Sequence, residues 1–185
     1  GFGTHIALIE DGEPVMGVVY FPAQGKLFFT NNSLSYMQDE KNGNQLRVLQ
    51  APTSIKGKLR ASTPWDKDRR PNRIGGQSYE AVPAVGGEQI CKVSEGLADV
   101  SWMQPVDYAY SHWDIAAADA ILRGAGARVL GMYEDESGQT ILRPVTYDDP
   151  EFVVPQTIAG NEHILNHLGH RITPTSKPGG LDADM

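Results

Sequence analysis

The stretch SHWDIAAADAILRGAGARVL, residues 111–130, decides the fold. Apolar and small residues recur in it at the i, i+3, i+4, i+7, i+8 and i+11 spacing of one helix face. These residues are Trp113, Ala116, Ala117, Ala120, Ile121 and Gly124. The segment GAGA ends the helix, and RVLG then continues as a strand. The stretch therefore predicts the strongest helix of the chain, which passes directly into a strand.

Upstream, the first thirty residues have the pattern of a three-stranded meander. The segments THIALI (4–9), VMGVVYF (15–21) and KLFFT (26–30) are rich in β-branched and aromatic residues. The turns EDGEP and PAQG separate them, which indicates antiparallel hairpins. The polar segment NNSLSYMQDEKNGN is a loop or a further hairpin leading to QLRVLQ at 45–50.

The middle of the chain predicts the order strand, loop, helix, strand. The segment GKLRAST (57–63) is a short strand, and the charged, proline-containing PWDKDRRPNRIGGQ is a long surface loop. The segment GGEQICKVSEG (86–96) is a helix, and LADVSWM continues as a strand. One face of this helix carries Ile90, Cys91, Ser94 and Leu97.

The C-terminal part predicts a hairpin at YEDESGQTI, a strand at FVVPQTIAG (152–160) and a short helix at NEHILNHLGH. The polar tail RITPTSKPGGLDADM is expected to be flexible. Antiparallel strands interrupted by a few helices indicate a layered α/β or α+β sandwich. We therefore expect one domain over residues 1–168 and a flexible tail over 169–185.

Composition narrows the class of protein. The chain has 185 residues and a net charge of −7, so no diffuse positive field attracts nucleic acid. No apolar run approaches the length of a membrane span. The single cysteine, Cys91, fits a reducing compartment and thus a cytoplasmic location, although many exported proteins also have one cysteine. The chain opens without methionine almost directly in a strand, so we expect that an upstream part was removed or omitted.

Asp114 is the first candidate for chemistry. Ser111 and Asp114 have the S-x-x-D spacing of a capping box, in which Ser111 accepts a hydrogen bond from the Asp114 N–H. From the pattern alone a helix cap is favoured, and a metal ligand is the alternative. His112 beside Asp114 is more typical of a surface or interface pair than of a proton shuttle.

Gly86, Gly87 and Asp107 are further candidates. Gly86 and Gly87 open a predicted helix, where backbone N–H groups cradle a phosphate, although such pairs are also plain turns. Asp107 lies seven residues before Asp114, close enough for one loop to bring both carboxylates to one pocket. The alternative for Asp107 is a solvated acid.

For the other reactive residues the pattern favours a structural role over a catalytic or metal-binding one. Cys91 on an apolar helix face is more typical of a packed small hydrophobe than of a nucleophile. His163 and His167 have the i, i+4 spacing that binds zinc, but no glutamate lies between them at the metalloprotease position. A polar helix face is therefore favoured there.

Four segments in order resemble the inositol monophosphatase superfamily, the magnesium-dependent, lithium-sensitive sugar and nucleotide phosphatases. WDIAAADAILRGAGARV resembles its second signature, W-D-x-A-A followed by an apolar helix. The others are THIALIEDGEPVMGVVYFPAQGKLFFT, GGEQICKVSEGLADV and FVVPQTIAGNEHILNHL. The likeness implies a sugar-phosphatase-like layered sandwich and hydrolysis of a small phosphomonoester with Mg²⁺. It also implies inhibition by lithium and a homodimer.

The resemblance also implies roles for single residues. Asp114 matches the W-D aspartate, a metal ligand, and Asp107 falls where the family places an acid that contacts substrate hydroxyls. Gly86 and Gly87 lie near a Gly-Ser or Gly-Ala pair that contacts substrate, without its serine. Gln89 stands where the bisphosphate nucleotidase branch has lysine, so a nucleotide substrate is less favoured.

The family's Glu-Glu and D-P-[LI]-D-G-T motifs should precede residue 1, and neither occurs in the sequence. We therefore expect the chain alone to be inactive, with the missing carboxylates supplied by an N-terminal segment or a second chain. Two alternatives stay open. One is a non-catalytic relative that keeps the fold as an interaction surface, with an exposed apolar face where the missing helices would pack. The other is a polyol- or nucleotide-binding module that holds its ligand at Gly86 and Gly87.

Overall fold

The structure is a computed structural model that describes residues 2–104, 110–148 and 153–169. A first sheet contains five consecutive antiparallel strands in the order β1-β2-β3-β4-β5. Its strands are β1 (Thr4–Glu10), β2 (Glu13–Phe21), β3 (Lys26–Asn31), β4 (Leu34–Asp39) and β5 (Gln45–Val48). The predicted meander over the first thirty residues is confirmed, and the polar segment after it forms a further hairpin.

A second sheet contains six strands in the order β11-β10-β13-β8-β6-β7, in which β6 pairs in parallel with both of its neighbours. Its strands are β6 (Leu59–Thr63), β7 (Tyr79–Pro83), β8 (Val100–Met103), β10 (Arg128–Glu134), β11 (Thr140–Pro144) and β13 (Thr157–Gly160). Two short strands, β9 (Tyr110–Ser111) and β12 (Val153–Val154), pair separately. Two 3₁₀ turns are η1 (Glu40–Asn42) and η2 (Lys67–Arg69).

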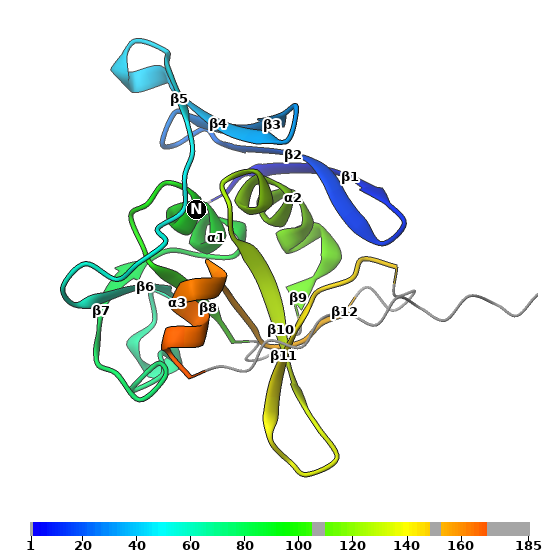
Figure 1. Cartoon of the computed structure of the whole chain (residues 1–185). Coiled ribbons are helices and arrows are strands. Elements are labelled where there is room, and N and C mark those ends of the chain that lie inside the picture. The colour runs from blue at the N-terminus through cyan, green and yellow to red at the C-terminus, as the bar shows by residue number, and fades with distance from the viewer. Residues whose placement is uncertain (1, 105–109, 149–152, 170–185) are drawn as a thin grey trace, which may run out of the picture.

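Helices α1 (Gly87–Ser94) and α2 (His112–Gly124) lie between the two sheets, and α3 (Glu162–His167) packs on the other side of the second sheet (Figure 1). One apolar core fills the space around α1 and α2, and a second lies between the second sheet and α3. The layers are thus sheet, helices, sheet, helix, and the expected layered α/β sandwich is confirmed. No helix in the described ranges is long and apolar enough to cross a bilayer.

Helix α2 is the centre of this arrangement because small residues let the first sheet approach it closely. A Cβ atom on Gly17 of β2 would lie 2.2 Å from the Ala117 carbonyl oxygen. At Gly124 a Cβ atom would lie 2.2 Å from the Oγ of Ser35, which donates to the Ile121 carbonyl at 2.6 Å. The alanine-rich sequence of α2 is therefore required by packing between two sheets, which buries residues 115–122.

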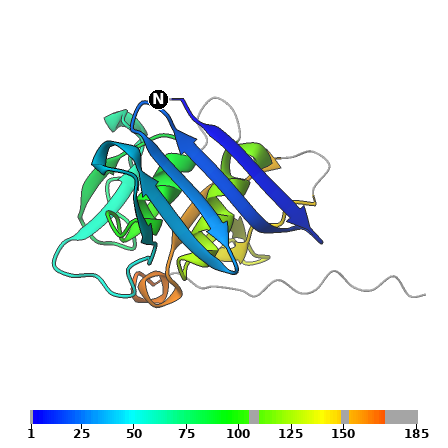
Figure 2. The ribbon, with the colours of Figure 1, turned by 90° about the horizontal axis from the view of Figure 1, so that it is seen from above.

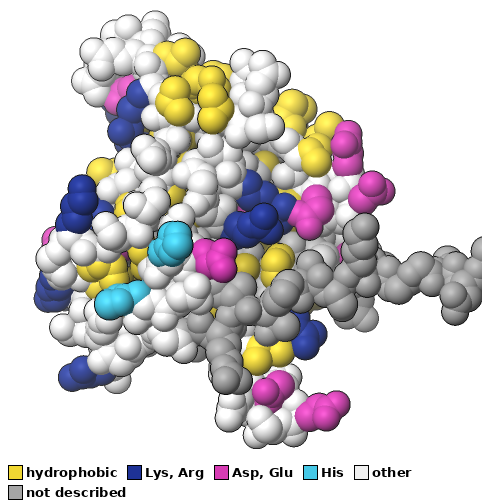
Figure 3. All heavy atoms as spheres, in the orientation of Figure 1, with side chains coloured by type: hydrophobic (Ala, Val, Ile, Leu, Met, Phe, Trp, Pro, Cys, Tyr) yellow, Lys and Arg dark blue, Asp and Glu magenta, His cyan; other side chains and the backbone are white. Residues whose placement is uncertain are grey.

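The two faces of the first sheet differ in what covers them. The inner face packs on α1 and α2. The outer face bears aliphatic side chains that are 44–60% exposed: Ile6, Leu8, Met16, Leu34, Leu46 and Val48. Figure 2 views the five strands from this side, and Figure 3 shows hydrophobic side chains over this sheet. An antiparallel sheet that faces water normally alternates to polar residues on that side, so this face is unusual.

One row of cross-strand pairs shows the continuity of the outer face. It runs from Ile6 through Val18, Phe29 and Tyr36 to Val48, so it crosses all five strands. The Phe29 and Tyr36 rings stack with centroids 5.5 Å apart. The outer face is therefore one apolar surface rather than scattered exposed residues.

Several sequence expectations need correction. Trp113 is 66% exposed, because it stands in the first turn of α2 at the edge of the packed region. Leu97 is exposed because α1 ends at Ser94. The strand expected over 152–160 is divided into β12 and β13, with Pro155 between them. The tail residues 170–185 lie outside the described residues.

Candidate functional site

A cavity of about 630 Å³ lies where the N-terminal ends of α1 and α2 meet the beginning of β1. Of the predicted site residues, Gly86, Gly87 and Asp114 line it together. Asp107 lies outside the described residues. A larger cavity of about 720 Å³ near Arg128 and His163 contains none of the predicted site residues. We therefore take the smaller cavity as the candidate site.

Asp114 is fixed at the start of α2 by the predicted capping box with Ser111. The Ser111 backbone N–H donates to the Asp114 Oδ2 at 2.8 Å. A carboxylate in the first helical turn is also favoured by the positive end of the helix dipole. The cap and a ligand role are compatible, because the bond to Ser111 holds the side chain in place while it lines the cavity.

Gly86 and Gly87 at the start of α1 are required for different reasons. Gly86 is the N-cap residue and has φ of 50°, a left-handed conformation that favours glycine. A Cβ atom on Gly87 would lie 2.5 Å from the His5 Cε1 and 3.0 Å from the Asp114 carbonyl oxygen. A serine at position 87 would not fit beside His5. The N-terminus of α1 thus has no side-chain cap and faces the cavity.

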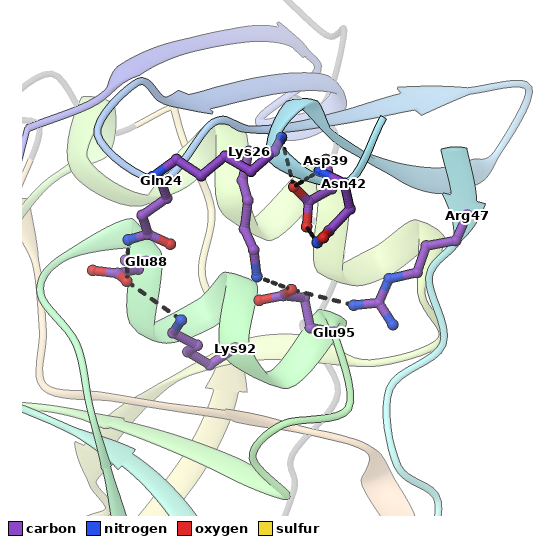
Figure 4. Close-up of polar contacts among 9 residues, drawn as sticks. Gln24, Lys26, Asp39, Asn42, Arg47, Glu88, Lys92 and Glu95 are labelled. Carbon is purple, nitrogen blue, oxygen red and sulfur yellow. Dashed lines mark hydrogen bonds and ion pairs between the residues drawn. The ribbon is translucent and has the colours of Figure 1, made fainter. Parts of the chain in front are cut away.

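Helix α1 is tied to the first sheet by polar contacts (Figure 4). Lys26 Nζ and Arg47 Nη2 both contact the Glu95 Oε1, at 2.5 and 3.2 Å, and the Glu95 side chain is only 2% exposed. At the other end of the helix, Gln24 Nε2 donates to the Glu88 Oε1 at 2.7 Å. These contacts hold the Gly86 and Gly87 segment at a fixed position beside Asp114.

Sequence reasoning missed several residues that line the cavity, above all His5 of β1. Its ring packs edge-on against Phe21, with centroids 5.9 Å apart. Burial lowers the pKa of His5, and the nearby Asp114 carboxylate opposes this shift. The sequence gives one signal for His5: it is a polar residue on the inward face of a strand whose other inward residues are apolar. Arg69, Gln24 and Gln104 also line the cavity.

The described residues do not form a complete metal site. No group of three or more His, Cys, Asp and Glu side chains that could hold an ion occurs among them. Asp114 is one carboxylate, and its Oδ2 already accepts the Ser111 bond. A magnesium site needs several oxygen ligands, so the donor set described does not fit the ion by itself.

Buried polar residues away from the cavity have structural roles. His112 is only 6% exposed and packs edge-on against Tyr147 at 5.2 Å, so a surface position is wrong, and the interface alternative stays a prediction. Asp119 accepts bonds from the Tyr147 hydroxyl and the Val129 N–H, and burial raises the pKa of Asp119 to about 7. Cys91 is buried in the core, which confirms the packed position, and burial raises the pKa of its thiol.

The chain is similar to a known protein family over most of its length. The model of the inositol monophosphatase family matches residues 1–172. The 3'(2'),5'-bisphosphate nucleotidase CysQ of Salmonella typhimurium is 29% identical over 140 residues, which are 76% of this chain and 53% of that protein. The chain thus spans about half the length of the curated relatives it matches.

Solved structures show the same fold. CysQ from Bacteroides thetaiotaomicron superposes with a TM-score of 0.63 at 22% identity, over 86% of this chain and 62% of that one. An inositol monophosphatase from Zymomonas mobilis gives a TM-score of 0.61 at 20% identity, over 90% of this chain and 60% of that one. At this identity the likeness concerns the fold.

Proposed function

The chain belongs to the inositol monophosphatase family, and we propose that the complete protein hydrolyses a small phosphomonoester. The observation that carries the proposal is the convergence of Asp114 with Gly86 and Gly87 in one cavity. The uncapped start of α1 favours an anion, because its first N–H groups and dipole are positive. A cavity of about 630 Å³ has the size of a small-molecule site.

The substrate class covers inositol phosphates, sugar phosphates and 3'-phosphonucleotides. Gln89 is fully buried, and its Nε2 donates to the backbone oxygens of Ser62 and Trp102. It therefore brings no positive charge for a second phosphate. Arg69 of η2 is a cation on the cavity wall and suits the anionic part of a substrate. Hydrolysis of one representative of each class by the complete protein would rank them.

Mg²⁺ is the proposed cofactor, with Asp114 as one of its ligands and lithium as an inhibitor. This rests on the family, because the described donor set is incomplete. Asp107 is proposed to contact substrate hydroxyls. A homodimer and a cytoplasmic location belong to the same proposal, the first supported by the family resemblance and the second by the single buried Cys91.

The missing ligands are proposed to come from a segment before residue 1 or from a second chain, so that residues 1–168 are the C-terminal portion of the phosphatase and 169–185 its flexible tail. Two features of the structure support this. Phe2 and Gly3 line the cavity, so a preceding segment would begin at its rim. The apolar outer face needs a cover, and the curated relatives are nearly twice as long as the stretch they share with this chain.

The test is phosphate release with Mg²⁺, measured for the 185-residue chain and for a longer protein that includes the segment. We expect turnover only from the longer protein, and its loss in Asp114→Asn. Robust turnover by the 185-residue chain, abolished by Asp114→Asn, would contradict the proposed need for a second segment.

A second candidate is a non-catalytic relative that uses the fold for binding. The exposed outer face and the incomplete set of metal ligands among the described residues favour it. It predicts that the longer protein binds a partner through that face and releases no phosphate from any of the three substrate classes. A ligand-binding module, in contrast, would bind inositol phosphate at Gly86 and Gly87 with an affinity independent of Mg²⁺.

A further inference from the structure

His5 has a buried polar atom that no described residue satisfies. Its Nδ1 is inaccessible to solvent and has no hydrogen-bond partner among the described residues. An unpaired buried nitrogen is unfavourable, and in a native structure it calls for an explanation such as a bound ligand. The next inward residues of β1 are Ala7 and Ile9, which pack against the core. An apolar residue at position 5 would therefore meet the needs of core packing, and a histidine is not required for it.

His5 belongs to a row of cross-strand pairs on the inner face of the first sheet, and the other polar residue of this row has a charged partner. Cross-strand pairs join His5, Val19, Phe28, Met37 and Arg47. The three central residues are apolar and buried, so the polar residues stand at the two ends. Arg47 contacts the buried Glu95. At the other end the Asp114 carboxylate lies near His5, but the Nδ1 of His5 has no hydrogen-bond partner among the described residues, and this end of the row opens on the cavity.

His5 lies beside the start of α1, where Glu88 and Asp114 also line the cavity. Its ring occupies the space that a side chain on Gly87 would fill, beside the Asp114 backbone oxygen. The ring is held by Phe21, so its nitrogens have a fixed direction. Because α1 begins at Gly87 and favours negative charge there, a phosphoryl group bound at the helix start would lie against the imidazole.

Resting on the phosphatase function proposed above, we propose that His5 is a phosphoryl-binding residue, which donates an imidazole N–H to a non-bridging oxygen of the substrate. A neutral imidazole always has one N–H donor, so the bond requires no change of charge. Mg²⁺ prefers oxygen ligands, which favours a role on the phosphoryl group over a role on the metal.

The test compares His5→Phe, which keeps an aromatic ring against Phe21, with His5→Asn, which keeps a polar group. In the complete protein with Mg²⁺, His5→Phe should raise KM about tenfold and leave kcat unchanged, since it removes binding common to ground and transition states. The inhibition constant of inorganic phosphate should rise by the same factor. His5→Asn should recover part of both losses.

His167→Phe, an exposed histidine of α3, is the matched control and should change neither constant. A raised KM with an unchanged phosphate inhibition constant would assign His5 to the leaving group and overturn the proposal. Equal constants in His5→Phe and the unmodified protein would overturn it as well. If the unmodified protein hydrolyses no substrate, the proposed function itself fails, and this inference falls with it.

A measurement on the unmodified protein covers the case in which His5→Phe does not fold. The imidazole ¹⁵N resonances of His5 should shift when inorganic phosphate is added in the presence of Mg²⁺, more than those of His163 and His167. Saturable phosphate binding without a change at His5 would overturn the proposal.

Discussion

Helices α1 and α2 meet at the same cavity, but they are held against the first sheet by different means. Along its length helix α2 is held by close packing, because Gly17 and Gly124 leave no room for a side chain beside it, and one ion pair, Arg123 with Glu13 of β2, is added at its C-terminal end. Helix α1 is held by charged contacts around Glu95 and Glu88. Their N-termini differ too, since α2 is capped by Asp114 and α1 has no side-chain cap. Helix α2 carries the candidate ligand Asp114, and the uncapped start of α1 faces the same cavity.

The largest effect is expected from Asp114→Asn, which separates the ligand role at α2 from the cap. Loss of a metal ligand should lower kcat/KM of the complete protein at least about 100-fold. Mutating even a residue that only hydrogen-bonds to a metal ligand typically lowers metal affinity or activity about 10–100-fold. Asparagine can still accept the Ser111 bond, so the unfolding midpoint should change little. A fall in stability that matches the loss of activity would show that Asp114 is only a cap.

Gly17→Ala tests the close packing of α2. The added Cβ atom would meet the Ala117 carbonyl oxygen, which is backbone and cannot rotate away. We expect a loss of about 3 kcal/mol in the free energy of unfolding, or about 6–12 °C in Tm. Val18→Ala, the neighbouring outer-face residue, is the control and should cost less. An equal cost for both variants would contradict the account of α2 packing.

Glu95→Gln tests the charged attachment of α1. The variant loses two ion pairs but leaves Lys26 and Arg47 partly exposed to water, so no buried charge is stranded. We expect a cost of about 1–2 kcal/mol by urea unfolding, together with a weaker dependence of stability on salt. The one printed ion pair between helix α2 and the sheet, Arg123 with Glu13, is not touched by Gly17→Ala, so that variant should keep the salt dependence of the unmodified protein.

Ser111→Ala should have the smallest effect. It removes one half of the capping box of α2, which costs about 1 kcal/mol and lowers Tm by about 2–4 °C. The exposed Ser78, changed to alanine, is the control. Equal midpoints for Ser111→Ala and the unmodified protein would show that Asp114 needs no help from the cap.

The sequence predicts the parts of the fold that local patterns determine. The meander over residues 4–30 alternates clearly, and the helix at 112–124 has both its spacing and its capping pair. Strand β7 was not predicted, because its sequence YEAVP has little alternation and it forms by pairing with β6. Leu97 was predicted on the apolar face of α1, but the helix ends before it. Trp113 was predicted on the apolar face of α2, but its position does not reach the core.

The candidate site was predicted only in part, because local sequence patterns reveal some of its residues and contacts between distant residues determine the others. Gly86, Gly87 and Asp114 have local signatures, and the structure brings them to one cavity. His5 was missed because its contact with Gly87 joins residues far apart in sequence, and only the fold reveals that one excludes a side chain on the other. The role of Gln89 also depends on backbone oxygens of two distant strands.

Because the outer face of the first sheet is apolar, the stability of this protein depends on the segment that covers it, and on whether that segment belongs to the same polypeptide or to a second chain. If the covering segment is part of the same polypeptide, adding an excess of the free segment leaves the unfolding midpoint unchanged, also in a homodimer. If it is a separate chain, mass action makes the midpoint rise with the concentration of the added segment, and calorimetry of the association records a negative heat-capacity change as the face loses its water. A series of melting curves with increasing amounts of the free segment therefore distinguishes the two arrangements without any assay of catalysis.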